Sequence, residues 1–424
     1  MLHTVKRRLY FVLAHYFAFW AKFVLRRWKP RIVVITGSTG KTTVLHLVEA
    51  QIGDQAVYSH HANSAIGLPF HILGLPPNVE SKGMWVSQIL KAPFAAFRTP
   101  PSKKLYIVEA DCDRPNEGKF LSKLLKPEVT LWVTVFRTHS MNFDYLVPDT
   151  FATHEEAIAY EFGYFPTHTQ KLVIVNGDQP IMLDQLSRVP EDVKVLAASS
   201  KDVQAYTNKD TETVYTIDGK QIRLSGLHPK VLGNSLQMVN GLLEYLDLPL
   251  DPTYKKFVLP PGRSSVFKGK NKLTLVDSTY NTGLGAMTAI LDLFAGYANP
   301  HKWLVLGDIL EQGSLEKAEH ERLAEKVVKL KVDHVVLLGP RTHKYTYPIL
   351  KKELTVPVVS FERPDEVLEY LNKNLKGGEA LLFKGGRFLE GVIEQILLNP
   401  EDAKNLVRRG AAWVKRRQKW GLPR

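Results

Sequence analysis

Residues 31–50 read RIVVITGSTGKTTVLHLVEA, and this stretch decides the fold. Four apolar β-branched residues in a row, 32–35, are typical of a strand that is buried in a parallel sheet. Gly37 and Gly40 interrupt the strand, and an amphipathic helical pattern follows them. The order of strand, glycine-rich loop and helix predicts a phosphate-binding loop.

In such a loop, backbone N–H groups surround a phosphate and the helix adds its positive N-terminal end. Lys41 would reach the outer phosphates of ATP, and the Thr42 hydroxyl would bind a magnesium ion. Ile35 stands where the usual pattern has a glycine, and a plain turn with a chance lysine is the alternative. We expect nucleotide contacts from the whole loop: Gly37, Ser38, Thr39, Gly40, Lys41, Thr42 and Thr43.

The composition is that of a globular enzyme. With 424 residues, 44% of them hydrophobic and 23% charged, the chain has room for two or three domains. Cys112 is the single cysteine, which excludes a disulfide framework within the chain and fits a reducing compartment. Cysteine and histidine nowhere have the spacing of a zinc site.

The net charge of +13 comes from the two ends of the chain. Residues 1–31 and residues 403–424 each hold eight Lys or Arg and no acid, so the rest of the chain is close to neutral. Basic ends attract polyanions such as nucleic acid or anionic lipid. Because the chain has no nucleic-acid-reading motif, we expect no nucleic acid as a partner.

The N-terminal end favours a membrane surface. Residues 9–21 (LYFVLAHYFAFWA) are apolar or aromatic nearly all round, with bases before and after them. A bilayer span needs about 20 apolar residues, and Lys22 cuts this run short. We favour a helix within residues 1–28 that lies in the interface of an anionic membrane; a helix packed on the domain and a true span are the alternatives.

A second buried strand, residues 105–108 (LYIV), ends at Glu109. Ligands bind at the carboxyl ends of the strands in open α/β sheets. Glu109 is therefore our second candidate ligand for magnesium, and an ordinary strand-end acid is the alternative.

The loop, with an apolar residue before TGSTGKTT, resembles that of the Mur ligase family. Further stretches resemble the motifs of this family in the same order, as far as about residue 395. They are Asn63 with residues 66–69 (IGLP), the stretch from Glu109 to His139, residues 176–180 (NGDQP), Asn234, and residues 261–263 (PGR).

The last third of the chain resembles the branch of this family that adds D-alanyl-D-alanine. The similar stretches are residues 277–283 (DSTYNTG), 302–313 (KWLVLGDILEQG) with His320, and 380–387 (ALLFKGGR). Ser278 replaces one of two acids of the branch, and Leu284 replaces its proline.

The resemblance implies an ATP- and magnesium-dependent ligase of peptidoglycan peptide synthesis. ATP would activate a carboxylate as an acyl phosphate, which an amine would attack to give an amide, ADP and phosphate. The amine would be D-alanyl-D-alanine or a similar one, and the acceptor would be like a muramyl peptide.

The resemblance also implies roles for single residues. Asn234 would contact adenine, Asp277 would hold the ribose, and Arg263 would reach the nucleotide. The implied catalytic residues are Lys41, Glu109, His139 and Arg263, and the implied metal ligands are Thr42, Glu109 and His139, with a structural histidine as the alternative for His139. The substrate candidates are Asn63, Tyr280, Asn281, His320 and Lys384.

The expected fold class is α/β. A central three-layer domain with the phosphate loop and a parallel sheet would precede a smaller, Rossmann-like α/β domain. Residues 193–226 alternate as antiparallel hairpins do. The expected parts are an N-terminal helix at 1–29, the central domain at 30–255, the C-terminal domain at 256–400 and a basic tail at 401–424.

Two features depart from the family. Only residues 1–30 precede the loop strand, so we expect the usual N-terminal UDP-binding domain to be absent. The carbamylated lysine that bridges to a second magnesium ion is missing as well, since no lysine occurs from 127 to 170. Tyr160 and Phe162 stand where it is expected, and the candidates to replace its charge are Glu155, Glu156 and Glu161.

These departures leave other functions open. One alternative is a degenerate member that binds ATP and acts as a membrane-attached scaffold or regulator of cell-wall enzymes. Another is a related ligase that acts on a different acid, such as a folate or polyglutamate. We expect a monomer in the cytoplasm, in peripheral contact with the inner face of the membrane.

Overall fold

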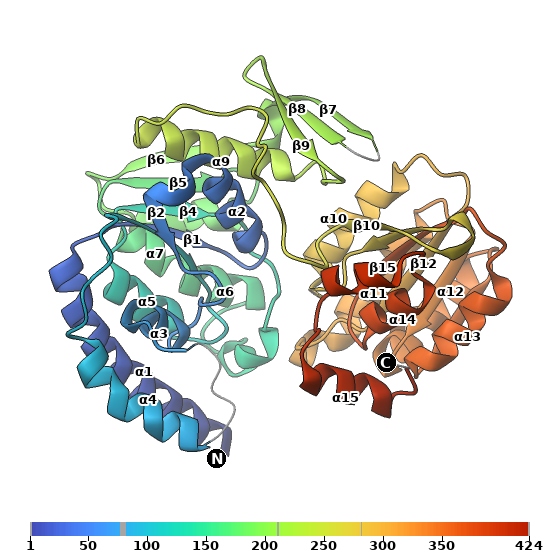
Figure 1. Cartoon of the computed structure of the whole chain (residues 1–424), viewed down its shortest axis with the longest axis horizontal. Coiled ribbons are helices and arrows are strands. Elements are labelled where there is room, and N and C mark those ends of the chain that lie inside the picture. The colour runs from blue at the N-terminus through green and yellow to red at the C-terminus, as the bar shows by residue number, and fades with distance from the viewer. Residues whose placement is uncertain (1, 77–81, 210–211, 281, 423–424) are drawn as a thin grey trace. The chain divides into compact units, whose positions relative to one another are not determined.

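The computed structural model describes residues 2–76, 82–209, 212–280 and 282–422. The chain divides into two compact units (Figure 1). The first unit comprises residues 1–135, 145–202 and 234–257, and the second comprises residues 136–144, 203–233 and 258–424.

The first unit is built on a sheet of six strands in the order β2-β3-β1-β4-β5-β6, and every neighbouring pair is parallel. The strands are β1 (Arg31–Thr36), β2 (Ala56–Tyr58), β3 (Leu105–Ala110), β4 (Val129–Trp132), β5 (Leu172–Asn176) and β6 (Lys194–Ala198). β1 pairs on both sides, and residues 32–36 are buried, as the β-branched run predicts.

Helices cover this sheet, with α2 and α9 along one face and α5 and α7 along the other in Figure 1. The fold class predicted for the central domain is therefore confirmed. The helices are α1 (Leu2–Trp28), α2 (Lys41–Ile52), α3 (Gly67–Leu73), α4 (Lys82–Ala95), α5 (Glu117–Leu125), α6 (His154–Phe162), α7 (Tyr164–Thr167), α8 (Pro180–Leu183) and α9 (Leu232–Tyr245).

The strand register brings two predicted ligand positions to one edge of the sheet. Ile35 of β1 lies beside Glu109 of β3, and Thr36 lies beside Ala110. The Thr36 hydroxyl donates a hydrogen bond of 2.9 Å to the carbonyl oxygen of Ala110. The phosphate loop and the acidic stretch after β3 therefore leave the sheet next to each other.

The N-terminal helix α1 packs against the first unit, in contact with α3 and α4. Its inner side is fully buried at Ala14, Phe17 and Ala21, and the Phe17 and Phe70 rings meet edge to face with centroids 4.6 Å apart. The helix packed on the domain, which the sequence left as an alternative, is what the structure has. Because these side chains form protein core, only the outer side of α1 is left for the predicted contact with a membrane surface, which stays a prediction.

No helix among the described residues combines the length and the apolar character needed to cross a bilayer.

One buried carboxyl group ties α1 to the body of the unit. The Tyr10 hydroxyl of α1 donates to Oε1 of Glu117 at 2.7 Å, and the backbone N–H of Ala65 donates to the same oxygen at 2.8 Å. Glu117 is fully buried, and burial followed by the charge of Asp113 raises the pKa of its carboxyl to about 7.

The second unit has a sheet of six strands in the order β10-β11-β15-β12-β13-β14. β10 and β11 are antiparallel and all other pairs are parallel. The strands are β10 (Ser265–Lys268), β11 (Thr274–Asp277), β12 (Lys302–Gly307), β13 (His334–Leu338), β14 (Val358–Phe361) and β15 (Ala380–Lys384). The helices are α10 (Leu284–Ala295), α11 (Glu316–Val328), α12 (Tyr347–Glu353), α13 (Pro364–Asn374), α14 (Leu389–Ile396) and α15 (Ala411–Lys419).

A separate antiparallel sheet of three strands also belongs to the second unit, and it confirms the predicted hairpins for residues 203–225. The prediction is wrong for the start of the range 193–226, because β6 pairs in parallel with β5 in the sheet of the first unit. Its strands are β7 (Val203–Lys209), β8 (Glu212–Ile217) and β9 (Lys220–Ser225).

The basic C-terminal residues fold back onto the second unit. Arg417 is 4% exposed and lies 3.9 Å from a carboxylate oxygen of Glu390, and Arg409 pairs with Glu394 at 2.9 Å. Leu422 is buried in the core that includes β15 and α14. Part of the positive charge that the sequence shows at this end is therefore neutralised within the fold.

We expect the stability of the first unit to depend on the ionisation of Glu117. The pKa of this carboxyl is raised in the fold from its ordinary value of 4.5 to about 7, so the free energy of unfolding should fall as the pH rises through this window. In Glu117→Gln this fall, on the order of 3 kcal/mol, should disappear. The measurement is urea unfolding of both proteins at pH 5 and pH 8, followed by tryptophan fluorescence.

The matched control is Glu191→Gln, which changes an exposed glutamate of the same unit. It should keep the pH dependence of the unaltered protein. An equal pH dependence in Glu117→Gln and the unaltered protein would show that Glu117 is ionised at neutral pH.

Candidate functional site

Thr134, two residues beyond β4, holds the phosphate loop. Its carbonyl oxygen accepts from the Ser38 N–H at 2.8 Å, and its hydroxyl accepts from the Thr39 N–H at 2.9 Å and donates to the Thr39 carbonyl oxygen at 2.8 Å. At Gly37, with φ 129°, a Cβ would lie 2.6 Å from the Thr134 carbonyl oxygen. Only glycine fits at that place.

The start of α2 is open to an anion. Gly40 precedes the helix with a left-handed backbone and supplies no side-chain cap. The first turn of an α-helix leaves N–H groups without partners inside the helix, and these groups suit a phosphate. Since Ser38 and Thr39 already bond to Thr134, the donors for a phosphate come from Gly40 onward.

Lys41 is buried at the centre of the loop. Its ammonium group donates to the Gly37 carbonyl oxygen at 2.6 Å and to that of Ser38 at 3.2 Å, and lies 2.7 Å from Oδ2 of Asp111. Burial lowers the pKa of Lys41, but the charges of Asp111 and Glu109 outweigh it and raise the pKa above its ordinary value. The side chain therefore keeps its positive charge at neutral pH.

Asp111 follows β3 and was not among our predicted site residues. Its backbone N–H donates to the carbonyl oxygen of Asn63 at 2.8 Å, which places the predicted substrate residue Asn63 against the acidic stretch. Its Oδ1 accepts from the Cys112 N–H at 2.9 Å. The signal that could have found it is its position, two residues after Glu109 at the carboxyl end of a parallel strand.

The residues around Lys41 fit a magnesium ion in their chemistry. Thr42 in the first turn of α2 and Glu109 at the end of β3 carry oxygen ligands, which magnesium prefers. Glu109 is half-buried, and its backbone N–H bonds to the Ser59 hydroxyl at 2.9 Å.

Asn234, predicted to contact adenine, lies in α9. Its amide nitrogen donates to Oδ1 of Asn176 at 3.1 Å and to Oδ2 of Asp178 at 2.8 Å. These partners belong to the 176–180 turn, and the Oδ1 atom of Asn234 is buried without a partner among the described residues. That oxygen is suited to accept a hydrogen bond from an amino group.

Two of the three glutamates of α6 that are candidates to replace the charge of the missing lysine have backbone partners of their own, and the replacement stays a prediction. Glu161 is buried, and its carboxylate accepts from the backbone of Lys119 at 3.2 Å, in the first turn of α5. Glu156 accepts from the Ala152 N–H at 3.0 Å and so caps its own helix. Tyr160 and Phe162 occupy the positions where the lysine was expected. The Phe162 side chain is buried in the hydrophobic core, and the Tyr160 ring packs against the Arg188 guanidinium.

His139, the predicted metal ligand, lies in the segment 136–144 of the second unit. Its Nδ1 is 2.5 Å from Oε2 of Glu311, and the hydrogen bond from His139 lowers the pKa of the Glu311 carboxyl. No pattern in the sequence points to this pair, because the partners are far apart in the chain. The role of His139 on a metal stays a prediction.

Polar residues gather in the second unit where β11 and β15 end. Asp277 is fully buried; its Oδ1 accepts from the backbone and the hydroxyl of Thr279 at 2.9 and 2.7 Å, and its Oδ2 has no partner among the described residues. Lys384 is buried near it. Burial and the nearby Arg263 and Arg408 lower the pKa of Lys384 to about 7, against the charge of Asp277.

Two arginines from distant parts of the chain meet around Tyr280. The Arg263 guanidinium lies over the Tyr280 ring, 3.7 Å from its centroid. Arg408, from the C-terminal residues, donates to the carbonyl oxygens of Thr279 at 3.2 Å and Tyr280 at 3.4 Å. Sequence reasoning treated residues 401–424 as a tail and missed Arg408. Asn281, a substrate candidate, lies outside the described residues.

His320 is not placed to touch a substrate. It is fully buried, its Nε2 accepts from the Ile309 N–H at 3.1 Å, and its Nδ1 bonds to the Glu316 carbonyl oxygen at 2.7 Å. Burial lowers the pKa of this neutral imidazole. His320 instead fixes the turn after β12, where the buried Asp308 accepts from Arg387 at 3.2 Å.

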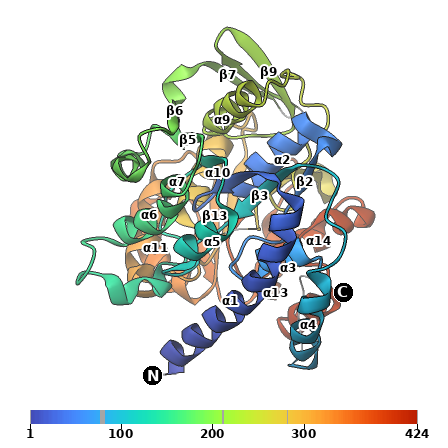
Figure 2. The ribbon, with the colours of Figure 1, turned by 90° about the vertical axis from the view of Figure 1, so that its left-hand side faces the viewer.

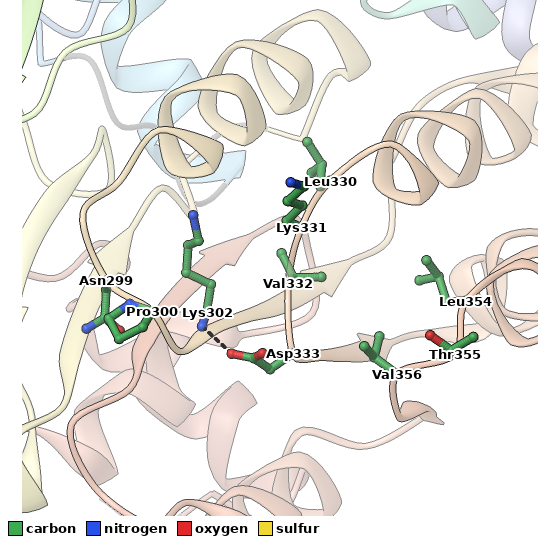
Figure 3. A pocket seen from close by; sticks show the side chains of 10 residues that line it. All are labelled: Asn299, Pro300, Lys302, Leu330, Lys331, Val332, Asp333, Leu354, Thr355 and Val356. Carbon is green, nitrogen blue, oxygen red and sulfur yellow. Dashed lines mark hydrogen bonds between the residues drawn. The ribbon is translucent and has the colours of Figure 1, made fainter.

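A shallow pocket of about 500 Å³ in the second unit lies away from these residues (Figure 3). It is at the amino ends of β12 and β13, where the backbone N–H of Lys302 donates to Asp333 at 2.9 Å. In α/β sheets, ligands bind at the carboxyl ends, so this pocket is not our candidate site.

Comparison with known families gives two matches. Residues 35–238 match the Mur ligase middle domain, and residues 262–387 match the domain described as Mur ligase, glutamate ligase domain. Together the two matches span well over half of the chain.

Named relatives extend over nearly the whole chain. The UDP-N-acetylmuramoyl-tripeptide--D-alanyl-D-alanine ligase of Bacillus subtilis (strain 168) is 23% identical over 407 residues, which cover 90% of this chain and 79% of that protein. The protein of the same name from Synechocystis sp. is 25% identical over 393 residues, which cover 87% and 76%.

Among solved structures, the MurF ligase from Thermotoga maritima in complex with ADP has the same fold. Its TM-score is 0.71 at 20% sequence identity, and the match covers 92% of this chain and 84% of that one.

We expect Thr134→Val to weaken nucleotide binding. The substitution keeps the shape of the side chain but removes the hydroxyl and with it the hydrogen bonds to the N–H, the carbonyl oxygen and the hydroxyl of Thr39, so the loop loses its fixed conformation. The affinity for ATP should fall roughly tenfold, as the loss of about one hydrogen bond implies. Isothermal titration calorimetry with ATP measures it.

The matched control is Thr130→Val, within β4 and four residues before Thr134, which removes a buried hydroxyl that bonds to Thr169 at 2.7 Å. It should cost stability and leave ATP affinity unchanged. Equal affinities of Thr134→Val and the unaltered protein would mean that the loop holds its shape without Thr134.

Proposed function

The chain belongs to the Mur ligase family, and we propose that it is an ATP-dependent ligase that joins a carboxylate to an amine in peptidoglycan peptide synthesis. The amine is D-alanyl-D-alanine or a similar one, and the acid is a muramyl peptide. The relatives from Bacillus subtilis and Synechocystis, which carry this activity in their names, support the choice.

One observation carries the proposal: a buried, charged lysine at a helix N-terminus, next to two carboxylates. Lys41 is held by the carbonyl oxygens of the loop and by Asp111, and Glu109 lies at the end of the neighbouring strand. This arrangement suits the transfer of a phosphoryl group, whose negative charge has to be neutralised throughout the reaction.

In the proposed reaction, an oxygen of the acceptor carboxylate attacks the γ-phosphorus of ATP, and ADP leaves with the bridging oxygen. The amine nitrogen then attacks the acyl carbon, phosphate leaves with its electron pair, and the nitrogen loses a proton. Lys41 binds the transferring phosphoryl group, and its carbonyl partners fix the position of its ammonium group beforehand. Excluding water protects the acyl phosphate from hydrolysis.

Thr42 and Glu109 are our proposed ligands for magnesium, with His139 as a further candidate, and the ion supplies positive charge at the phosphates. Asn234 is proposed for adenine, Asp277 for the ribose and Arg263 for the nucleotide. The partnerless oxygens of Asn234 and Asp277 support the first two assignments.

A second candidate function is a protein that binds ATP without turnover and serves as a scaffold for cell-wall enzymes. The observation in its favour is the lack of a lysine from 127 to 170, together with the engaged carboxylates of Glu156 and Glu161. The charged state of Lys41 favours turnover. We also propose that the protein acts as a monomer in the cytoplasm, where ATP is available, at the inner face of the membrane.

The test is an incubation of the protein with ATP, magnesium, D-alanyl-D-alanine and UDP-muramyl-tripeptide, followed by mass spectrometry of the product and measurement of ADP. We expect product from the unaltered protein and at least a 100-fold lower rate from Lys41→Ala, since a charge at the transferring phosphoryl group is lost, worth roughly 3 kcal/mol.

The control Lys123→Ala removes an exposed lysine of α5 and should keep full activity. Thermal unfolding of all three proteins shows whether they are folded. ADP release without product would mean a different acid or amine, and ATP binding without ADP release would favour the scaffold.

A further inference from the structure

The outer side of helix α4 is strongly apolar. Leu90, Phe94 and Phe97 are 65%, 81% and 68% exposed, and Val86 is exposed as well. The spacing of these residues, four, four and three positions, puts them on one side of the helix and the turn that follows it. Large exposed side chains that gather in this way mark an interaction surface.

The inner side of α4 holds smaller and more polar residues. Ala92 and Ala96 are fully buried, and Gln88 is buried too. Trp85 packs against Phe70 with ring centroids 6.0 Å apart. In a helix that only covers a core, the larger apolar residues face inward. Apart from Trp85, the large apolar residues Leu90 and Phe94 of α4 lie on its outer side, so this side needs another explanation.

Helix α1 lies next to α4 and adds to this surface (Figure 1, Figure 2). The Tyr16 hydroxyl of α1 donates to the Ile89 carbonyl oxygen at 2.8 Å, and Arg27 donates to the Ala96 carbonyl oxygen at 3.0 Å. The outer side of α1 exposes three more apolar residues. We call the whole set the α1–α4 surface: Leu9, Val12, Phe19, Val86, Leu90, Phe94 and Phe97.

The charged residues of the two helices are of one sign, since the sequences of α1 and α4 contain Lys and Arg but no Asp or Glu. Lys22 and Arg26 on α1 and Lys91 on α4 are exposed. A second copy of this chain would bring the same positive charge to the contact, and like charges repel. An anionic lipid surface offers the opposite charge and an apolar layer below it.

We propose that the α1–α4 surface docks the protein on an anionic lipid bilayer, with its aromatic and aliphatic side chains among the lipid chains and its lysines and arginines on the lipid phosphates. The bound helices lie on the membrane and do not cross it. The proposal is independent of the ligase reaction, because neither Lys41 nor the acids around it belong to this surface.

The test measures co-sedimentation of the full chain, without nucleotide, with two kinds of vesicle. We expect binding to vesicles of phosphatidylcholine and phosphatidylglycerol at low salt, weaker binding as salt rises, and little binding to pure phosphatidylcholine. The triple variant Leu90→Ser, Phe94→Ser, Phe97→Ser should lower the partition coefficient at least about tenfold. Because these side chains are exposed, the fold should be retained.

The matched control is Val231→Ser, Val258→Ser, Leu398→Ser, which removes three exposed apolar side chains of the second unit and should bind as the unaltered protein does. A charge variant, Lys22→Glu with Lys91→Glu, should weaken binding to the anionic vesicles. Circular dichroism checks that all variants are folded.

Three results would overturn the proposal. The first is no sedimentation with anionic vesicles at low salt, and the second is equal binding by the triple variant. The third is a dimer, seen by analytical ultracentrifugation, that the triple substitution dissociates, because a second copy would then cover the surface.

Discussion

The rest of the first unit depends on one buried positive charge, the ammonium group of Lys41. Burying a lone charge costs several kcal/mol, so the surroundings have to offset it. Two loop carbonyl oxygens and Asp111 do so, and each partner constrains another part of the chain. The carbonyl groups fix the loop after β1, and Asp111 fixes the stretch after β3 and, through Asn63, the stretch before α3.

The sequence allowed the strand, the loop and α2 to be predicted because their signals are local. Four β-branched residues, two glycines and a helical pattern stand within twenty residues, and each agrees with the others. Glu109 could be predicted as a site residue for a similar reason, since a run of apolar residues ends at it. The register of β1 and β3 then brings it next to the loop.

The parts that could not be predicted rest on contacts between distant residues. Whether α1 faces lipid or protein depends on Phe70 and Glu117, and no property of residues 1–28 reveals those partners. Arg408 reaches Thr279 from the C-terminal end, and His320 is satisfied by backbone groups that only the fold brings near. His320 was predicted to contact the substrate because it matches a family motif. A match to a motif does not indicate whether the side chain is buried, and His320 is fully buried.

The packing of α1 has a consequence for where this protein can be cut. The match to the Mur ligase middle domain begins at residue 35, which suggests the loop strand as a natural starting point. A chain that began there would lack Phe17 and Trp28, so Phe70 and Tyr106 would each lose one ring partner. The boundary read from homology thus runs through the hydrophobic core. A fragment that contains the phosphate loop and keeps this core intact therefore has to include α1.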